Sequence, residues 1–221
     1  MITERDFQIF ALMSEFGGKT FLNVLSQTFF ENEQVARNRL NILKKDKMIK
    51  FVKTGLMSPR NAIYPTDAGL RYFKEKGLKT VVTSVSSSTV EHLVIEQIAY
   101  FYLKKIGKNV ERTIVKNHSK SHAHTPDLAY VHDQKKVYIE IERTIKREDE
   151  LAKIFLNIKK DDVHAIIYVF ENEKKMAQIA TKIPIFEKVH YVTIDALKSA
   201  SKDGKIGAIK QIEYLKKIGE K

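Results

Sequence analysis

The sequence predicts an α+β protein, in which a small helical region ending in a β-hairpin precedes a larger region with a mixed sheet flanked by helices. Three observations favour this fold class. Residues 1–80 carry amphipathic helical patterns and two short apolar runs, whereas residues 90–195 alternate helical and strand patterns in the order α-β-β-β-α-β-α-β. Between them, residues 81–89 read VVTSVSSST, a stretch of small hydroxyl residues typical of a linker. We therefore expect domains at 1–80 and 90–221.

Composition points to a soluble, DNA-binding class of protein. Of the 221 residues, 43% are hydrophobic and 30% are charged, a balance typical of globular chains. The 39 Lys and Arg exceed the 27 Asp and Glu by 12 charges, so a polyanion such as nucleic acid is the expected partner. A membrane surface is not expected, because there is no long uncharged apolar run and no signal peptide pattern, and the expected location is cytoplasmic. The chain has no cysteine, so a metal would need oxygen or imidazole ligands.

Three helices are expected at the N-terminus. The first is capped by Thr3 and ends at the glycine pair 17–18, because Gly readily adopts the left-handed conformation that closes a helix. The second is expected over Thr20–Phe29 and the third from about Asn32 to Asp46. In the third helix, the apolar residues that recur at helical spacing are expected to be buried: Ala36, Leu40 and Leu43.

A β-hairpin and a closing helix are expected next. The apolar runs Met48–Val52 and Ala62–Tyr64 flank the basic, turn-rich connector KTGLMSPRN, which predicts the hairpin. The segment IYPTDAGLRYF then leads into a helix that extends to about Lys76, with Thr66 or Asp67 as its cap. Three helices, a basic hairpin and a closing helix resemble a winged helix-turn-helix domain. In that family the third helix enters the major groove of DNA, and the hairpin contacts the backbone or the minor groove.

This resemblance implies that the outer face of the third helix and the hairpin bind double-stranded DNA. Arg37, Asn38 and Asn41 are expected to face bases, because guanidinium and amide groups can form paired hydrogen bonds with base edges. The basic residues expected to meet phosphates are Lys44, Lys45, Lys50, Lys53 and Arg60. The alternative is a solvated helix face, or a surface that binds protein.

The second region begins with a long helical pattern. The expected elements are a helix at 90–106, a strand at 110–115, a hairpin of 128–131 with 136–141, a helix at 147–159, a strand at 163–170, a helix at 171–182 and a strand at 190–194. The run 163–170 is almost continuously apolar, as in strands buried on both faces. The basic tail 199–221 is expected to form a helix that adds nonspecific DNA affinity. The loop at 116–125 holds three histidines that are either metal ligands or polar loop residues: His118, His122 and His124.

Three acidic residues are placed where they could share a metal ion. Asp127 starts one strand of the second hairpin and Glu140 lies near the end of its partner, so both carboxylates can reach one edge of the sheet. Glu142 lies two residues further and points the same way. An all-oxygen site with Asp127 and Glu140 as ligands suits Mg²⁺ or Mn²⁺, which supports phosphodiester cleavage. Alternatively, Pro-Asp is a turn dipeptide and the glutamates are surface residues of an amphipathic strand.

The Pro-Asp pair, the spacer and the sequence Glu-Ile-Glu at 140–142 resemble the PD-(D/E)xK superfamily of restriction-endonuclease-like nucleases. Glu142 stands where a Lys is usual, and Lys146 or Lys153 could supply that positive charge. With the N-terminal region and the pair His92 and Glu96, the chain also resembles the replication-relaxation family of plasmid proteins, which are related to restriction-endonuclease-like relaxases.

The resemblance implies roles for individual residues. Asp127, Glu140 and Glu142 would be the catalytic acids, with Glu96 as a further acid and with His92 and Arg143 in support. The implied function is site-specific nicking or cleavage of DNA in plasmid mobilisation or replication. The resemblance also implies a relaxase or replication protein as a further partner, and two copies of this chain bound to paired DNA sites. The alternative, suggested by the Glu in place of Lys, is a non-catalytic DNA-binding accessory factor or regulator with a degenerate nuclease fold.

Overall fold

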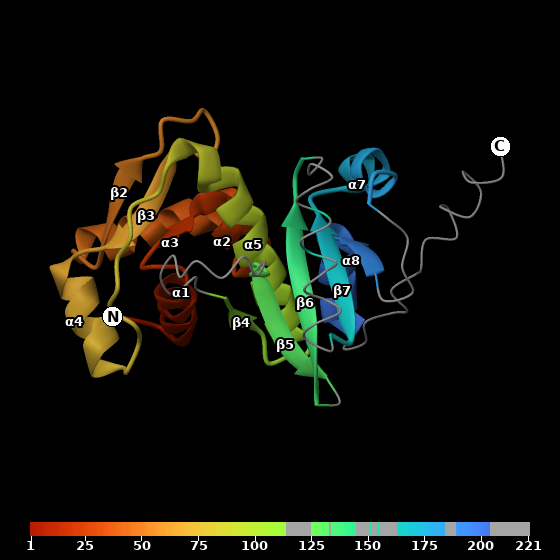
Figure 1. The fold of residues 1–221 in the computed structure, drawn as a ribbon. Helices are drawn as coiled ribbons and strands as arrows, with labels where there is room; N and C mark the ends of the chain where they lie inside the picture. Colours follow the sequence, from red (N-terminus) through yellow and green to blue (C-terminus); the bar gives the residue numbers. More distant parts are fainter. Residues whose placement is uncertain are drawn as a thin grey trace. The chain divides into compact units, whose positions relative to one another are not determined.

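A computed structural model describes residues 1–113, 125–132, 134–144, 151, 154, 163–183 and 189–203. The chain divides into two compact units, Met1–Phe101 and Tyr102–Lys221, each with its own sheet. Figure 1 shows the elements of both units along the chain. Among the described residues, no helix has the length and apolar character needed to cross a bilayer.

The first unit consists of helices with a small antiparallel sheet. In chain order its elements are α1 (Glu4–Glu15), β1 (Thr20–Phe21), α2 (Leu22–Thr28), α3 (Glu33–Lys45), β2 (Ile49–Lys53), β3 (Asn61–Pro65), α4 (Asp67–Glu75) and the first part of α5 (Ser87–Lys105). The three strands lie in the order β1-β3-β2, and both pairings are antiparallel. The expected hairpin is therefore confirmed as β2 and β3.

Local signals set the ends of the helices in this unit. Thr3 and Asp6 form a reciprocal capping box at the start of α1. The side chain of Asn32 accepts a hydrogen bond from the backbone N–H of Val35 (3.0 Å) and caps α3, whose expected apolar stripe is buried. One expected boundary is wrong. The helix predicted over Thr20–Phe29 begins only at Leu22, because the two preceding residues pair with β3.

The core of the first unit joins α1, α3, α4 and the sheet. Its largest buried members include Phe10, Met13, Leu25, Leu40, Ile63 and Phe73. Thr66, one of the two expected caps, accepts a hydrogen bond from the backbone N–H of Gly69 (3.3 Å) at the start of α4. A Cβ added at Gly69 would lie 2.3 Å from the carbonyl oxygen of Met48, so only glycine allows α4 to approach the chain this closely.

The hydroxyl-rich stretch expected as a linker, 81–89, makes specific contacts with the first unit. The ammonium group of Lys19, which is buried, donates a hydrogen bond to the carbonyl oxygen of Thr83 (2.9 Å). In α5, the side chain of Gln97 donates to the carbonyl oxygen of Lys19 (3.2 Å). These bonds connect Thr83 and Gln97 to Lys19 within the first compact unit, Met1–Phe101. The domain boundary expected at 81–89 stays a prediction.

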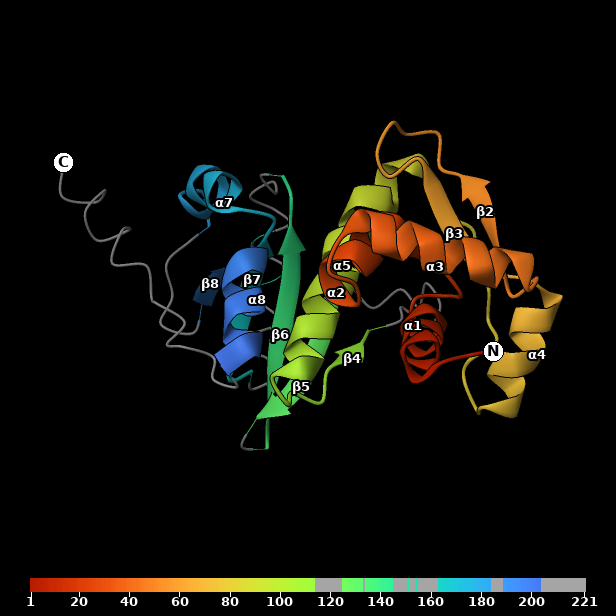
Figure 2. The ribbon, with the colours of Figure 1, turned by 180° about the vertical axis from the view of Figure 1, so that it is seen from behind.

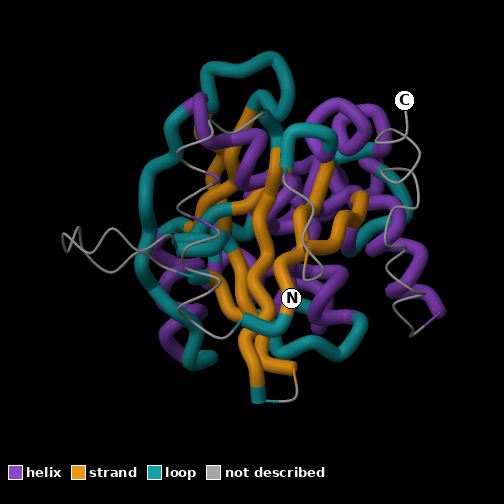
Figure 3. Tube along the Cα trace, turned by 45° about the vertical axis from the view of Figure 1, so that its right-hand side comes forward, coloured by secondary structure: helices purple, strands orange, loops and turns teal. Residues whose placement is uncertain are grey.

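The second unit contains a mixed five-stranded sheet with the strand order β4-β5-β6-β7-β8. Figure 1 labels β4 to β7, and Figure 3 colours the strands of the chain orange. After the end of α5, its elements are β4 (Glu111–Arg112), β5 (Leu128–His132), β6 (Lys135–Glu142), β7 (Ala165–Phe170), α7 (Glu173–Ala180), β8 (Val189–Thr193) and α8 (Ile194–Asp203). The pairings of β5 with β4 and β6 are antiparallel, whereas those of β7 with β6 and β8 are parallel. The helix α8 lies against one face of this sheet (Figure 2).

Strand β7 is the centre of the second core. All six of its residues are buried, as its continuous apolar run predicts. The core on one face of the sheet includes Tyr138, Ile166, Tyr168, Phe170, Ile179 and Tyr191. Leu151 and Ile154, the two described residues of the helix expected at 147–159, are buried in the same cluster. This placement accounts for their apolar spacing in the sequence.

Some expected elements are shorter or fall outside the description. Of the strand expected at 110–115, residues 110–113 are described, and Glu111 and Arg112 among them pair with β5. Helix α8 begins at Ile194, before the helix expected from residue 199. The segments 114–124, 145–150 and 204–221 lie outside the described residues. They contain the three histidines of the predicted loop, Lys146 and most of the basic tail, and Lys153 also lies outside the description.

Candidate functional site

The first candidate site is a groove of about 630 Å³ in the first unit, between α3 and the β2–β3 hairpin. Its base is formed by apolar residues of α2, α3 and the sheet, including Leu22, Leu40 and Ile63. Positive and amide-bearing side chains line it from both sides: Asn23, Arg37, Asn41, Lys53, Arg60 and Asn61. A concave surface with this lining can contact an anionic, hydrogen-bonding polymer.

The structure brings four of the eight predicted DNA-binding residues together in this groove. Arg37 and Asn41 come from α3, and Lys53 and Arg60 come from the hairpin. The other four, which do not line the groove, are Asn38, Lys44, Lys45 and Lys50. All eight side chains are exposed, as a role in binding requires.

Several of these side chains make weak contacts that a ligand could replace. The guanidinium group of Arg37 pairs with Glu33 one turn earlier, and both side chains are more than half exposed. Such a surface pair contributes about 0.5 kcal/mol, so little is lost when Arg37 turns to another acceptor. Asn38 accepts a hydrogen bond from Gln34 (3.0 Å), and the ammonium group of Lys44 lies 5.4 Å from the centre of the Phe51 ring.

Sequence reasoning missed groove residues that come from other segments. Asn23 lies on α2, and its amide contacts the hydroxyl of Ser58 in the hairpin loop (3.5 Å). Asn61 lies at the start of β3 and Met57 at the hairpin loop. The connector KTGLMSPRN marked the loop as basic, but only the folding of the hairpin beside α2 and α3 places these residues in one groove.

One basic residue of α3 has a structural role that the sequence did not reveal. Arg39 forms an ion pair with the fully buried carboxylate of Asp6 in α1, and the Arg39 Nε–Asp6 Oδ1 distance is 2.9 Å. Burial acts to raise the pKa of Asp6, but the hydrogen bonds from Arg39 and Thr3 outweigh it, and the net pKa lies below its ordinary value. The pair therefore fixes α3 to α1 and sets the direction in which the exposed face of α3 points.

The second candidate site is a row of polar side chains across the sheet of the second unit. Leu128 pairs with Ile139, which places Asp127 beside Glu140 at the next position along the two strands. Glu140 is paired with Tyr168 of β7, and Tyr168 is paired with Tyr191 of β8. Paired residues of neighbouring strands point to the same face of a sheet. The row is therefore Asp127, Glu140, Tyr168 and Tyr191.

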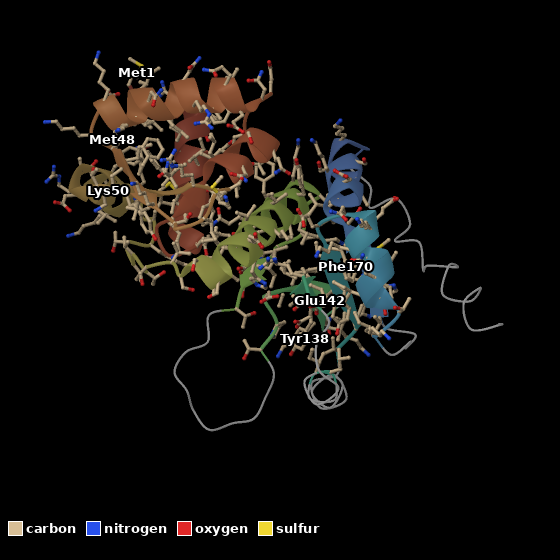
Figure 4. All side chains as sticks on the ribbon, turned by 90° about the horizontal axis from the view of Figure 1, so that it is seen from above. Met1, Met48, Lys50, Tyr138, Glu142 and Phe170 are labelled. Atoms are coloured by element: carbon tan, nitrogen blue, oxygen red, sulfur yellow. The ribbon has the colours of Figure 1, made fainter. Side chains whose placement is uncertain are left out.

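Glu142 lies in the next row of the same face. It is paired with Phe170 of β7, and both residues are labelled in Figure 4. Glu140 and Glu142 are each only 3% exposed. The alternative that these glutamates are surface residues of an amphipathic strand is therefore wrong, because β6 is covered on both faces from Val137 onward.

The buried carboxylates change the electrostatics of the row. Burial raises the pKa of Tyr168, and the charges of Glu140 and Glu142 raise it further. Burial also raises the pKa of Tyr191 to about 12. Both phenols are therefore neutral at physiological pH, and removing charged carboxylates from water costs several kcal/mol unless cationic or hydrogen-bonding groups compensate it.

Asp127 is held at the edge of the sheet by backbone groups. Its carboxylate oxygen Oδ2 accepts a hydrogen bond from the N–H of Ile141 (2.8 Å), and its carbonyl oxygen accepts one from the N–H of Thr113 (3.2 Å). Within the described part of the chain, no three acidic or imidazole side chains are gathered closely enough to hold a metal ion. The carboxylate of Asp127 thus lies against the β6 backbone at Ile141. Its use as a metal ligand with Glu140 stays a prediction.

The remaining predicted residues are divided between the two units. Glu96 is buried on α5 in the first unit, and His92 is half-buried one turn earlier. The other three acids and Arg143, which directly follows β6 and is half-buried, belong to the second unit. The catalytic and supporting roles of these residues stay predictions.

Comparisons with known proteins give a distant structural likeness. No protein-family model and no curated protein sequence matches the chain. Among solved structures, the chain is similar to the small subunit of the heterodimeric restriction endonuclease R.BspD6I, with 17% sequence identity and a TM-score of 0.37. The aligned region covers 67% of this chain and 84% of that subunit.

Proposed function

We propose that the first unit binds double-stranded DNA as a winged helix-turn-helix domain. The order helix, strand, helix, helix and hairpin supports this assignment, with α3 as the recognition helix and the β2–β3 hairpin as the wing. The exposed face of α3 would read bases in the major groove, and the wing would contact the adjacent backbone. The excess of 12 positive charges in the chain would contribute a sequence-independent attraction.

The observation that carries this proposal is the groove between α3 and the hairpin. Arg37 and Asn41 face it from the helix, where their groups suit guanine and adenine edges. Lys53 and Arg60 face it from the hairpin, where they suit phosphates. Groups suited to base edges and groups suited to phosphates therefore line one concave surface, from the helix and from the hairpin, and this supports the proposal.

Binding to DNA tests this function directly. The full chain would first be used to select 30-bp duplexes from a random-sequence pool, and affinity for a selected duplex would be measured by fluorescence anisotropy. Replacing Arg37 and Asn41 by Ala together should weaken binding roughly 100-fold, because each paired contact to a base is worth about 1–3 kcal/mol. The matched control is Arg71→Ala, which removes an exposed arginine of α4 outside the groove. Equal affinity of the double variant and the control would contradict the proposal.

A second candidate function is metal-dependent cleavage of the bound DNA, as in a nuclease or relaxase of a plasmid or mobile element. It is favoured by the burial of Glu140 and Glu142 next to each other on β6, with Asp127 beside Glu140. The oxygen-only donor set fits Mg²⁺ or Mn²⁺, for which Asp127 and Glu140 would be ligands. When bound, such an ion neutralises charge that develops on the phosphate. Glu142 would orient a water molecule or take up its proton.

The competing proposal is an accessory factor that binds DNA for a separate relaxase or replication protein. The hydrogen bond between Asp127 and the backbone of Ile141 favours it, because it gives the Pro-Asp pair a structural role. Incubation of supercoiled plasmid carrying a selected site, with Mg²⁺ or Mn²⁺, separates the two. A nuclease should give nicked or linear product that Glu140→Gln abolishes and that the exposed control Glu171→Gln retains. Absence of product with all three proteins, together with unchanged DNA binding, would favour the accessory factor.

A further inference from the structure

The loop of the β2–β3 hairpin presents a large apolar side chain to solvent. Met57 is 97% exposed, whereas the next most exposed large hydrophobic residue within the described chain, apart from the terminal Met1, is Val131 at 66%. A long thioether side chain in this position gains nothing from the core of its own unit. Single exposed apolar side chains are common on protein surfaces, so what distinguishes Met57 is its place at the groove beside the proposed DNA contacts.

The loop that carries Met57 is held in one conformation by Thr54. The hydroxyl of Thr54, which is buried, donates to the carbonyl oxygen of Pro59 (2.6 Å) and accepts from the N–H of Leu56 (3.1 Å). The backbone N–H of Thr54 also donates to the carbonyl oxygen of Arg60 (3.0 Å), which closes the loop. Gly55 has a φ of +83°, a conformation that other residues rarely adopt. Because the loop is ordered beforehand, little conformational entropy remains to be lost when its tip binds.

Cationic side chains stand on both arms of the hairpin next to this tip. Lys53 ends β2 and is paired with Asn61, and Arg60 directly precedes β3; both cations are exposed. Met57 lines the same groove as these two residues. An apolar tip between two cations is complementary to the minor groove of duplex DNA, where an apolar base stack lies between two phosphate backbones.

We propose that Met57 is a wedge that enters the minor groove and partly unstacks one base step, which bends the bound duplex. Apolar side chains inserted in this way kink DNA towards the major groove. Pyrimidine–purine steps unstack most readily, so Met57 favours such a step at a fixed distance from the bases that α3 reads. This inference rests on the proposed DNA-binding function and adds a specificity determinant that makes no hydrogen bond to a base.

The test uses the full chain and a 30-bp duplex that it selects from the random-sequence pool, with 2-aminopurine placed in turn at each position and dyes at both ends. Wild-type protein should raise the fluorescence of 2-aminopurine at the one base step that Met57 unstacks. It should also increase energy transfer between the dyes at the two ends of the duplex. Met57→Ala should remove both signals and weaken binding roughly 10-fold. Met57→Leu, which keeps an apolar side chain of similar volume, should restore them. Both variants should unfold at the wild-type temperature, because the side chain is exposed.

The outcomes separate this inference from the function on which it rests. The wedge proposal is overturned if the Met57→Ala variant still produces the fluorescence and energy-transfer changes. It is also overturned if the wild-type complex shows neither change. In both cases DNA binding through the groove stands. Failure of the wild-type chain to select or bind any duplex overturns the proposed function and the wedge together.

Discussion

Replacing Asp6 by Asn should destabilise the first unit and release α3 from α1. The carboxylate of Asp6 is fully buried, and the side chain of its partner Arg39 is 21% exposed. Breaking a fully buried ion pair costs about 3–5 kcal/mol, and partial hydration of Arg39 reduces this to about 2–3 kcal/mol. The carboxylate also accepts a hydrogen bond from the N–H of Thr3 (2.7 Å), and weakening this cap adds about 0.5–1 kcal/mol. The expected loss is therefore about 3 kcal/mol, or roughly 12–24 °C in Tm for a unit of this size.

The sign of the pH dependence follows from the lowered pKa of Asp6. A carboxyl group whose folded-state pKa lies below its unfolded value stabilises the fold above the unfolded value of about 3.9, and the stabilisation is lost as pH falls through the folded value. The difference between wild type and Asp6→Asn should therefore be full at neutral pH and should shrink below about pH 4.

Hydrogen exchange and a double-mutant cycle provide the assay. Urea unfolding gives the free-energy differences for Asp6→Asn, Arg39→Met and the double variant, and amide exchange of residues 33–45 reports on α3. We expect the two single changes to be strongly non-additive, with faster exchange in α3 in each of them. Glu33→Gln, which removes a partner from a pair that is more than half exposed, should cost less than about 1 kcal/mol. Additive effects of Asp6→Asn and Arg39→Met would refute the reasoning.

Three further predictions concern other parts of the chain. Gly69→Ala places a Cβ 2.3 Å from the carbonyl oxygen of Met48 and should lower the unfolding free energy by about 1–3 kcal/mol, and an unchanged urea midpoint would contradict this. Arg60→Ala should reduce the slope of log Kd against log salt by about 1 for a selected duplex, and an unaltered slope would remove Arg60 from the phosphate contacts. Burial, with the neighbouring charge of His164, lowers the pKa of His190, so the unfolded state binds protons more readily than the folded state. Stability of the second unit should then fall as pH drops below about 6.5, and His190→Gln should reduce this loss when urea unfolding is compared at two pH values.

Local patterns predicted most of the secondary structure because the interactions that produce them are local. The cap at Asn32 and the stripe of Ala36, Leu40 and Leu43 act within a few turns of one helix, and α3 follows them closely. The same reasoning failed at Thr20 and Phe21, where pairing with β3 outweighs helical preference. Contacts between residues about 40 positions apart leave no periodic signal in a single sequence.

The sequence by itself determined that α3 has an exposed basic and amide-bearing face, that a basic hairpin follows it, and that acids stand near the end of β6. Only the tertiary structure decided how these groups are used. A period of two shows that Glu140 and Glu142 share a face, but not that other strands and side chains cover that face, since burial depends on segments distant in sequence. Likewise, the charges of Arg37 and Arg39 look equivalent along α3. Arg39 pairs with the buried carboxylate of Asp6, while Arg37 remains exposed in the groove. The attraction between opposite charges is much stronger beside a buried carboxylate than at the solvated surface.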